Sequence, residues 1–145
     1  MGFSIVEATE VTPDLVEAFV RLTPQLSKSN PGPDEAELRA IVSSPASVLF
    51  MAVDDGGRYV GTLTLALFRI PTAMRAWIED VIVDAAVRGQ GVGEALNRAA
   101  LDRARAEGAK TVDLTSRPSR GAANRLYQRI GFEQRDTNVY RYDLD

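Results

Sequence analysis

The sequence predicts an α/β domain with a mixed, mostly antiparallel central sheet of about seven strands, flanked by about four helices. The first observation is the order of the expected elements, β-α-α-β-β-β-α-β-α-β-β, which contains no internal repeat. The second is a hairpin signal, the turn sequence DDGG between two apolar runs. The third is one strand–helix–strand crossover between residues 75 and 115, which requires a parallel pair of strands. A chain of 145 residues fits a single domain spanning residues 1–145.

The N-terminal third of the chain is expected to form one strand and two helices. Residues 3–8 alternate in polarity as a strand does, and residues 14–26 carry apolar residues at helical spacing. Thr12 fits the N-cap of this helix and Pro13 its first turn. A second helix is expected over residues 34–42, after the loop sequence SKSNPGP. The apolar residues with helical spacing are Leu15, Phe19, Leu22 and Leu26 in the first helix and Leu38, Ile41 and Val42 in the second.

The middle of the chain is expected to supply most of the sheet. Strands over residues 48–53 and 59–69 flank the DDGG turn, and a third strand follows over residues 75–83. A helix is expected over residues 91–107, because apolar residues recur along one side of it. That apolar stripe consists of Val92, Ala95, Leu96, Ala99 and Ala100.

The C-terminal part is expected to complete the sheet. A strand is expected over residues 111–115, followed by a helix over residues 119–130 that Ser119 caps. The last two strands, over residues 132–135 and 139–144, are expected to form a closing hairpin.

The composition excludes several kinds of chemistry. The chain has 0 Cys and 0 His, which removes thiol nucleophiles, disulfides, histidine bases and the usual zinc sites, so no metal is expected. A net charge of -3 and the lack of a long apolar run favour neither nucleic-acid nor membrane partners. The N-terminus resembles no secretory signal, and a cytoplasmic location is expected. Any reaction must therefore use carboxylates, hydroxyls, cationic side chains, backbone amides or a bound cofactor.

Three glycines in the segment VRGQGVGEAL open the longest expected helix, directly after an apolar strand. The first amides of a helix lack helical partners, and the helix dipole adds partial positive charge there. Gly89, Gly91 and Gly93 would let these amides approach an anion without obstruction by side chains. Arg88 adds a full positive charge beside them. The segment therefore predicts a site for a pyrophosphate group.

Two common phosphate-binding patterns do not fit this segment. A P-loop requires a Lys-Ser/Thr pair after the glycines, which is missing here. The dinucleotide fingerprint requires Gly or Ala at its sixth position, which is Glu94 or Leu96 depending on the starting glycine. Too little chain also remains after the glycines for a doubly wound sheet.

The segment RGQGVG resembles the pyrophosphate loop of the GNAT N-acetyltransferase superfamily, whose pattern is Arg/Gln-x-x-Gly-x-Gly/Ala. The longer segment IEDVIVDAAVRGQGVGEAL is similar to that family's fourth strand, loop and third helix. The segment AANRLYQRIGF resembles a later helix of the family, and the resemblance covers the whole chain. It implies transfer of an acetyl group from acetyl-CoA to an amine, by direct attack through a tetrahedral intermediate.

The resemblance also implies which residues bind acetyl-CoA. The backbone from Val81 through Ile82 to Val83 would pair with the pantetheine arm, and one of its N–H groups would stabilise the oxyanion. The carboxylate of one pyrophosphate-loop residue, Glu94, is expected to face solvent. The residues expected to hold the pyrophosphate are Arg88, Gly89, Gln90, Gly91, Val92, Gly93 and Glu94.

Tyr127 occupies the family's general-acid position, from which it would protonate the departing thiolate. The alternative is that Tyr127 only packs against Leu126 and Ile130. Asn124 lies one helical turn earlier and could contact the cofactor arm. Arg120 stands where many relatives carry Asn, so the family's own pantetheine contact at that position does not transfer directly.

Glu79 and Asp80 are the candidates for a general base, because they interrupt an apolar strand near the expected reaction centre. In a regular strand the two side chains would point to opposite faces, whereas a bulge would change this. The alternative is that they are solvated or ion-paired at the end of the strand.

The acceptor is expected to be the primary amine of a small molecule or peptide. The segments IEDVIVD and RGQGVG are similar to those of glucosamine-phosphate acetyltransferases, and Arg117 and Arg120 could meet a phosphate. The loops at residues 25–38 and 68–77 should supply part of the acceptor pocket, and Trp77 either lines it or lies in the core. Two other functions stay open, an acyl-CoA-binding module without catalysis and a structural or partner-binding protein. The oligomeric state is also open, a homodimer included.

Overall fold

The computed structural model describes residues 2–145, which form two units. One unit ends at Leu114 and the other spans Thr115–Asp145. The elements are β1 (Phe3–Glu7), α1 (Pro13–Leu26), α2 (Glu35–Ser43), β2 (Ser47–Asp54), β3 (Tyr59–Ile70), β4 (Ala73–Val83), the short 3₁₀ turn η1 (Ala85–Val87), α3 (Val92–Ala106), β5 (Thr111–Asp113) and α4 (Gly121–Ile130).

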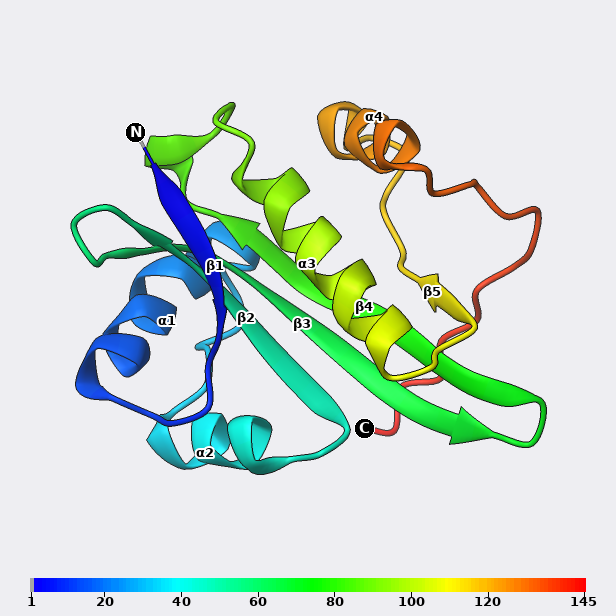
Figure 1. The fold of residues 1–145 in the computed structure, drawn as a ribbon, viewed down its shortest axis with the longest axis horizontal. Coiled ribbons are helices and arrows are strands. Elements are labelled where there is room, and N and C mark those ends of the chain that lie inside the picture. The colour runs from blue at the N-terminus through cyan, green and yellow to red at the C-terminus, as the bar shows by residue number, and fades with distance from the viewer. Residues whose placement is uncertain (1) are drawn as a thin grey trace. The chain divides into compact units, whose positions relative to one another are not determined.

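The first unit contains one mixed sheet with the strand order β1-β2-β3-β4-β5 (Figure 1). The first four strands are antiparallel neighbours, and β5 pairs parallel to β4 after the α3 crossover. The hairpin between β2 and β3 is closed by Asp54, whose carboxylate accepts from the amides of Gly56 and Arg58 at 2.9 Å each. The predicted α/β class, hairpin and crossover are therefore confirmed.

Local capping signals fix the starts of the first two helices. The hydroxyl of Thr12 accepts a hydrogen bond from the amide of Leu15 at 3.2 Å, with Pro13 in the first turn, as predicted. Asp34 caps α2 and forms a capping box with Glu37. These contacts are local in sequence, which is why the sequence predicted both helix starts to within one residue.

The two faces of the sheet carry different helices. On one face Leu15, Leu22 and Leu38 from α1 and α2 form a buried cluster with Met51 and Ile82 from the strands. Leu26, the last of the apolar residues with helical spacing in α1, is not in this cluster and is 39% exposed.

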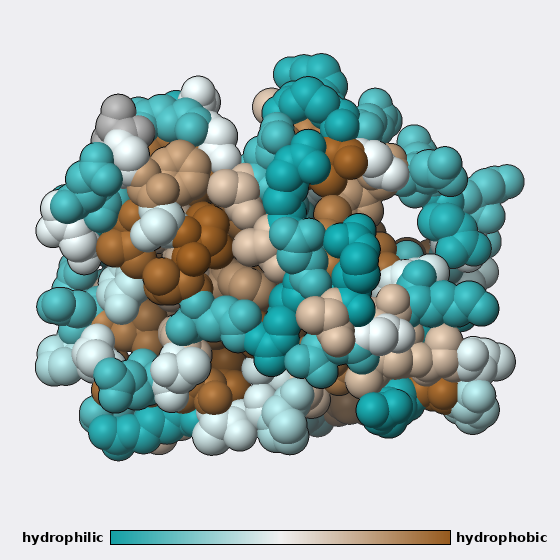
Figure 2. All heavy atoms as spheres, viewed as in Figure 1, coloured by the Kyte–Doolittle hydropathy of each residue, from teal (hydrophilic) through white to brown (hydrophobic). Residues whose placement is uncertain are grey.

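The opposite face of the sheet is covered by α3, which approaches β3 at a glycine. A Cβ atom at Gly61 would lie 3.0 Å from Val92 and 3.2 Å from Leu96, so only glycine permits this approach. Figure 2 shows hydrophilic residues along the outer side of α3 and hydrophobic residues gathered over β1.

The second unit differs from the prediction in two respects. The helix α4 begins at Gly121 with Arg120 at the N-cap position, so Ser119 does not cap it. Residues 132–145 form no strand, which leaves the sheet with five strands rather than seven. The apolar residues that suggested the final strand, Val139, Tyr140, Tyr142 and Leu144, are 71–88% exposed. Alternation alone does not make a strand, because its backbone also needs a paired edge.

None of the helices among residues 2–145 has the length and apolar character needed to span a membrane.

Candidate functional site

A β-bulge interrupts β4 where the sequence placed the candidate bases. Thr64 of β3 pairs with Glu79 and Thr62 pairs with Ile82, so β4 contains one extra residue at this step. Asp80 lies within the bulge and has a positive φ of 52°, which is rare for any residue with a side chain. Strained backbone of this kind is concentrated at functional sites in proteins.

The bulge changes which side chains share a face. Because paired residues point to the same side of a sheet, Glu79 and Ile82 both lie on the face covered by α1 and α2. Trp77 lies on the same face, and its indole N–H donates to the Glu79 carboxylate at 2.7 Å. Of the two alternatives for Trp77, a position in the buried core does not hold, because the residue is only half-buried.

The two carboxylates of the bulge have different environments. Partial burial, reinforced by the neighbouring charge of Glu79, raises the pKa of the Asp80 carboxyl above its usual value. A carboxylate whose pKa is raised holds a proton more readily, which is the direction a general base requires.

Beyond the bulge, the outer edge of β4 is unpaired. The parallel pairing with β5 covers only Arg75 to Trp77, opposite Thr111 to Asp113. Within the part of the chain that the structure describes, no strand pairs with the outer edge of residues 78–83. The backbone of Val81, Ile82 and Val83 therefore lies in a stretch that can add an extended ligand by backbone hydrogen bonds.

The glycine segment forms an open loop between β4 and α3. The turn η1 follows β4 and buries Val87, after which residues 88–91 are exposed. Gly89 and Gly91 have φ values of +82° and +84°, and a Cβ at either would meet nothing within 4 Å. At its two glycines the loop thus exposes backbone without side chains, as the sequence predicted.

The start of α3 has the features of an anion site. Its N-cap is Gly91, which supplies no capping side chain, so the first amides of the helix are not satisfied from that position. The carboxylate of Glu94 is held by Arg98 at 3.0 Å and is about one-third exposed, so it does not simply face solvent as expected. An anion at this end would meet backbone donors and the positive end of the helix dipole, with Arg88 next in the chain.

Three residues that fix the start of this loop, Arg21, Gln25 and Asp84, were not identified from the sequence. The Arg21 guanidinium donates to the Asp84 carboxylate at 2.6 Å, and Gln25 accepts from the Ala85 amide at 2.9 Å. Burial alone would raise the pKa of Asp84, but the Ala86 amide and the charge of Arg21 lower it overall. An Asp directly after a strand and before a short helical turn is an N-cap signal, whereas nothing local marks Arg21 or Gln25.

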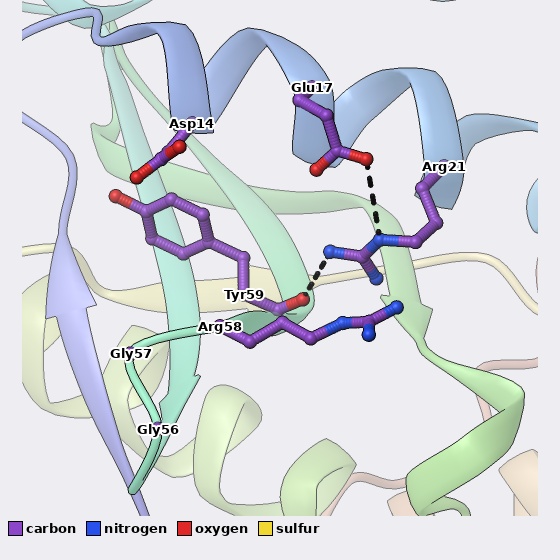
Figure 3. Close-up of a pocket in the computed structure, with 7 residues that line it drawn as sticks. All are labelled: Asp14, Glu17, Arg21, Gly56, Gly57, Arg58 and Tyr59. Atoms are coloured by element: carbon purple, nitrogen blue, oxygen red, sulfur yellow. Dashed lines mark hydrogen bonds and ion pairs between the residues drawn. The ribbon is translucent and has the colours of Figure 1, made fainter.

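A hollow of about 270 Å³ lies between α1 and the β2–β3 turn. Figure 3 shows Arg21 and Glu17 of α1 facing Arg58 and Tyr59 across it. None of its lining residues was among the predicted site residues, but Arg21 connects the hollow with Asp84 at the entry to the loop.

In the second unit, Asn124 stabilises the turn before α4. Its amide group donates to the backbone carbonyls of Arg117 at 2.9 Å and Arg120 at 2.8 Å. Its carbonyl oxygen is the remaining polar atom with which it could contact a cofactor.

Tyr127 lies one turn further along α4 and is half-buried. Its ring packs edge-on against Phe132, with ring centroids 5.8 Å apart. Burial raises the pKa of Tyr127, and the charge of Arg120 opposes this only in part. The phenol is therefore protonated at neutral pH, as a proton donor must be.

Comparison with known proteins identifies the family of this chain. The model of the acetyltransferase (GNAT) family matches residues 13–132. The chain belongs to the GNAT acetyltransferase family. This GNAT protein is an acetyl-CoA-dependent N-acetyltransferase, and the predicted membership of the GNAT superfamily is confirmed.

The individual proteins and structures to which this chain is similar include several acetyltransferases. Glucosamine 6-phosphate N-acetyltransferase 1 of Oryza sativa subsp. japonica is 29% identical over 137 residues, covering 89% of this chain and 81% of the relative. A putative acetyltransferase from Agrobacterium tumefaciens has a TM-score of 0.84 and 25% identity, covering 97% of this chain and 99% of that one. Glucosamine-6-phosphate N-acetyltransferase from Arabidopsis thaliana shares the fold, with a TM-score of 0.83, 19% identity and full coverage of both chains.

The family uses acetyl-CoA as co-substrate. Among residues 2–145, no three His, Cys, Asp or Glu side chains form a group that could hold a metal ion.

Proposed function

We propose that this GNAT enzyme transfers the acetyl group of acetyl-CoA to the primary amine of a small molecule or peptide. The observation that carries the proposal is the uncapped, glycine-flanked start of α3, directly after the unpaired edge of β4. Residues 88–94 hold the pyrophosphate through their amides, and the edge at Val81 and Val83 aligns the pantetheine arm. The open space and positive φ at Gly89 and Gly91 support this assignment, because an anion can approach there without displacing a side chain.

The chain's own groups complete the reaction. The amine must lose a proton before or as it attacks the thioester carbonyl, and Asp80 or Glu79 accepts that proton. A backbone N–H of the β4 edge donates to the carbonyl oxygen as negative charge develops on it. Tyr127 donates its phenolic proton to the departing thiolate, so the base and the acid are different residues.

The phosphate group is proposed to enter at the uncapped end of α3, which a pair of glycine substitutions can test. Gly91 and Gly108 lie just beyond opposite ends of α3, have φ values of +84° and +81°, and have no atom within 4 Å of an added Cβ. Gly91→Glu and Gly108→Glu therefore impose similar backbone strain. Only Gly91→Glu should abolish the rise in thermal stability that coenzyme A confers by mass action. Equal coenzyme A protection in both variants would contradict the proposal.

A binding module without catalysis is the alternative, and it makes a different prediction. Release of free thiol from acetyl-CoA should rise with at least one amine of a chemically varied panel if the chain is a catalyst. Protection by coenzyme A without any amine-dependent release would favour the binding module.

Glucosamine 6-phosphate is the acceptor we propose to test first. The rice relative at 29% identity carries that compound in its name, which is the observation favouring it. The exposed Arg117 and Arg120 precede α4 and supply cationic groups suited to a phosphate.

A further inference from the structure

The loop before α3 is fastened to α1 by two side chains to which the reaction assigns no role. Arg21 donates to the carboxylate of Asp84 at 2.6 Å, and Gln25 accepts from the amide of Ala85 at 2.9 Å. Arg21 and Gln25 are four residues apart and so lie on one side of α1. One face of α1 thus forms hydrogen bonds with two consecutive residues, Asp84 and Ala85, directly after the end of β4.

The Arg21 side chain is itself held in place. Its second terminal nitrogen donates to the carbonyl of Tyr59 at 2.7 Å, and its Nε lies 3.9 Å from the Glu17 carboxylate (Figure 3). The side chain is only 20% exposed, and that of its partner Asp84 is 9% exposed. Removal of the guanidinium would therefore leave a buried carboxylate without its ion pair.

Asp84 connects the Arg21 side chain to the loop through hydrogen bonds with the backbone of η1. Its carboxylate accepts from the Ala86 amide at 3.1 Å and its carbonyl accepts from the Val87 amide at 3.0 Å, which together form η1. Its own amide donates to Val60 of β3 at 2.9 Å, so Asp84 is fixed to the sheet as well. The orientation of η1 determines where the exposed residues 88–91 begin.

We infer that Arg21 is a positioning residue for acetyl-CoA binding. Acting through Asp84 and aided by Gln25, it holds η1 so that the amides of residues 88–94 already point at the pyrophosphate site. The inference rests on the proposed function, because it requires this loop to bind the nucleotide. Preorganised donors bind more tightly because less conformational entropy is lost on binding.

The test compares Arg21→Met with Arg39→Met in the full chain. Arg39 forms an ion pair of 2.7 Å with Glu35 on the exposed side of α2, far in sequence from the loop, and serves as the matched control. Arg21→Met should weaken coenzyme A binding and raise the KM for acetyl-CoA about tenfold, with kcat changed less than about twofold. Arg39→Met should change neither. Arg21→Lys keeps the charge near Asp84 and should restore part of the affinity.

Two further measurements separate positioning from general destabilisation. In Arg21→Met the Val87 amide should exchange with solvent faster, while the amides of the β2–β3 ladder keep wild-type rates. In a double-mutant cycle with Asp84→Asn, the two losses of affinity should be clearly non-additive. Gln25→Met removes the hydrogen bonds of Gln25 with the Ala85 amide and the Arg21 carbonyl but keeps the Arg21 guanidinium. It should weaken binding in the same direction, which keeps the test available if Arg21→Met does not fold.

The possible outcomes distinguish the positioning role of Arg21 from the proposed function of the protein. Wild-type protein that binds coenzyme A, together with unchanged affinity in Arg21→Met and Gln25→Met, would overturn this inference alone. Wild-type protein that binds no coenzyme A would overturn the proposed function and this inference with it. A fall in kcat with unchanged affinity would show that Arg21 acts on the reaction and not on the loop, and would also overturn the inference.

Discussion

Trp77 donates its indole N–H to the carboxylate of Glu79, while the next residue, Asp80, has a carboxyl group whose pKa is raised by partial burial and by the charge of Glu79. The two neighbouring carboxyl groups thus have different surroundings, because Glu79 accepts a hydrogen bond from Trp77 whereas Asp80 is partly buried. A carboxyl group whose pKa is raised by its surroundings is a candidate for proton transfer in an enzyme. This difference favours Asp80 over Glu79 as the group that accepts the proton of the amine.

Asp80→Asn should lower kcat by roughly 10²-fold, within the range of general base catalysis, whereas Glu79→Gln should have a much smaller effect. Gln at position 79 still offers an oxygen to the Trp77 indole, so the bulge should persist. The measurement is the pH dependence of kcat/KM for each variant. The loss of activity on the acid side should follow the Asp80 carboxyl and disappear in Asp80→Asn. A larger loss in Glu79→Gln would reverse the assignment.

The stability of the same variant should depend on pH. The folded-state pKa of Asp80 is raised above the usual value of 3.8, so its ionisation destabilises the fold increasingly as the pH rises above 3.8, and fully above the folded pKa. Asp80→Asn should therefore raise the Tm at pH 7 relative to wild type. This part of the gain should vanish below about pH 3.8, where the wild-type carboxyl is protonated in both states. A gain from the better fit of Asn to a positive φ would not change with pH.

The parts of the fold that the sequence predicted well depend on local signals. Thr12 and Pro13 start α1 and Asp34 starts α2 through contacts within one turn of the helix, and the left-handed conformation of Gly91 marks the start of α3. The open glycine loop was predicted for the same reason, because the conformations of Gly89 and Gly91 are properties of the segment itself.

Features that depend on distant parts of the chain were not predicted. The bulge at Asp80 is defined by how β4 pairs with β3, so the pattern of apolar residues within β4 alone does not reveal it. Arg21 and Asp84 are 63 residues apart, so no local pattern joins them. The tail shows the opposite case, since the local alternation around Tyr140 and Tyr142 predicted a strand, whereas residues 132–145 form none and leave these side chains exposed.

Tyr127→Phe should lower kcat while the affinity for coenzyme A stays close to the wild-type value. Phe at this position keeps the edge-on packing with Phe132, so the change removes the phenolic proton and little else. Tyr140 is 88% exposed, and Tyr140→Phe is the matched control. We expect a loss in kcat of roughly 10²-fold for Tyr127→Phe and no change for Tyr140→Phe. Parallel losses of kcat and affinity in Tyr127→Phe would show that Tyr127 has a structural role.

Arg117→Gln should raise the KM for a phosphorylated amino sugar and leave the KM for the unphosphorylated sugar unchanged. The reason is that a phosphate gains charge-assisted hydrogen bonds from a guanidinium, about 1.5–3 kcal/mol each, whereas a hydroxyl gains far less. Arg105→Gln provides the control, because Arg105 is also exposed and pairs with Asp102 near the end of α3. Steady-state kinetics with glucosamine 6-phosphate and glucosamine would measure the difference. Equal changes with both sugars would exclude a phosphate contact at Arg117.

Gly61→Ala should disturb both the packing of the sheet and the cofactor site. The added Cβ would lie 3.0 Å from Val92, the first residue of α3, and 3.1 Å from the backbone carbonyl of Ile82, which cannot move aside easily. Overpacking of this kind costs about 1–3 kcal/mol in the free energy of unfolding. Because the displaced residue begins α3, where the pyrophosphate is proposed to bind, coenzyme A affinity should fall as well.

Gly56→Ala is the control for this last experiment, since an added Cβ there meets only the side chain of Asp54, at 3.4 Å. Urea unfolding would report stability, and the shift of Tm with coenzyme A would report binding. We expect Gly61→Ala to lower both the stability and the affinity for coenzyme A, and Gly56→Ala to leave both at wild-type values. If Gly61→Ala were destabilised but bound coenzyme A with wild-type affinity, the position of Val92 would not matter for the cofactor. The start of α3 would then be the wrong place for the pyrophosphate.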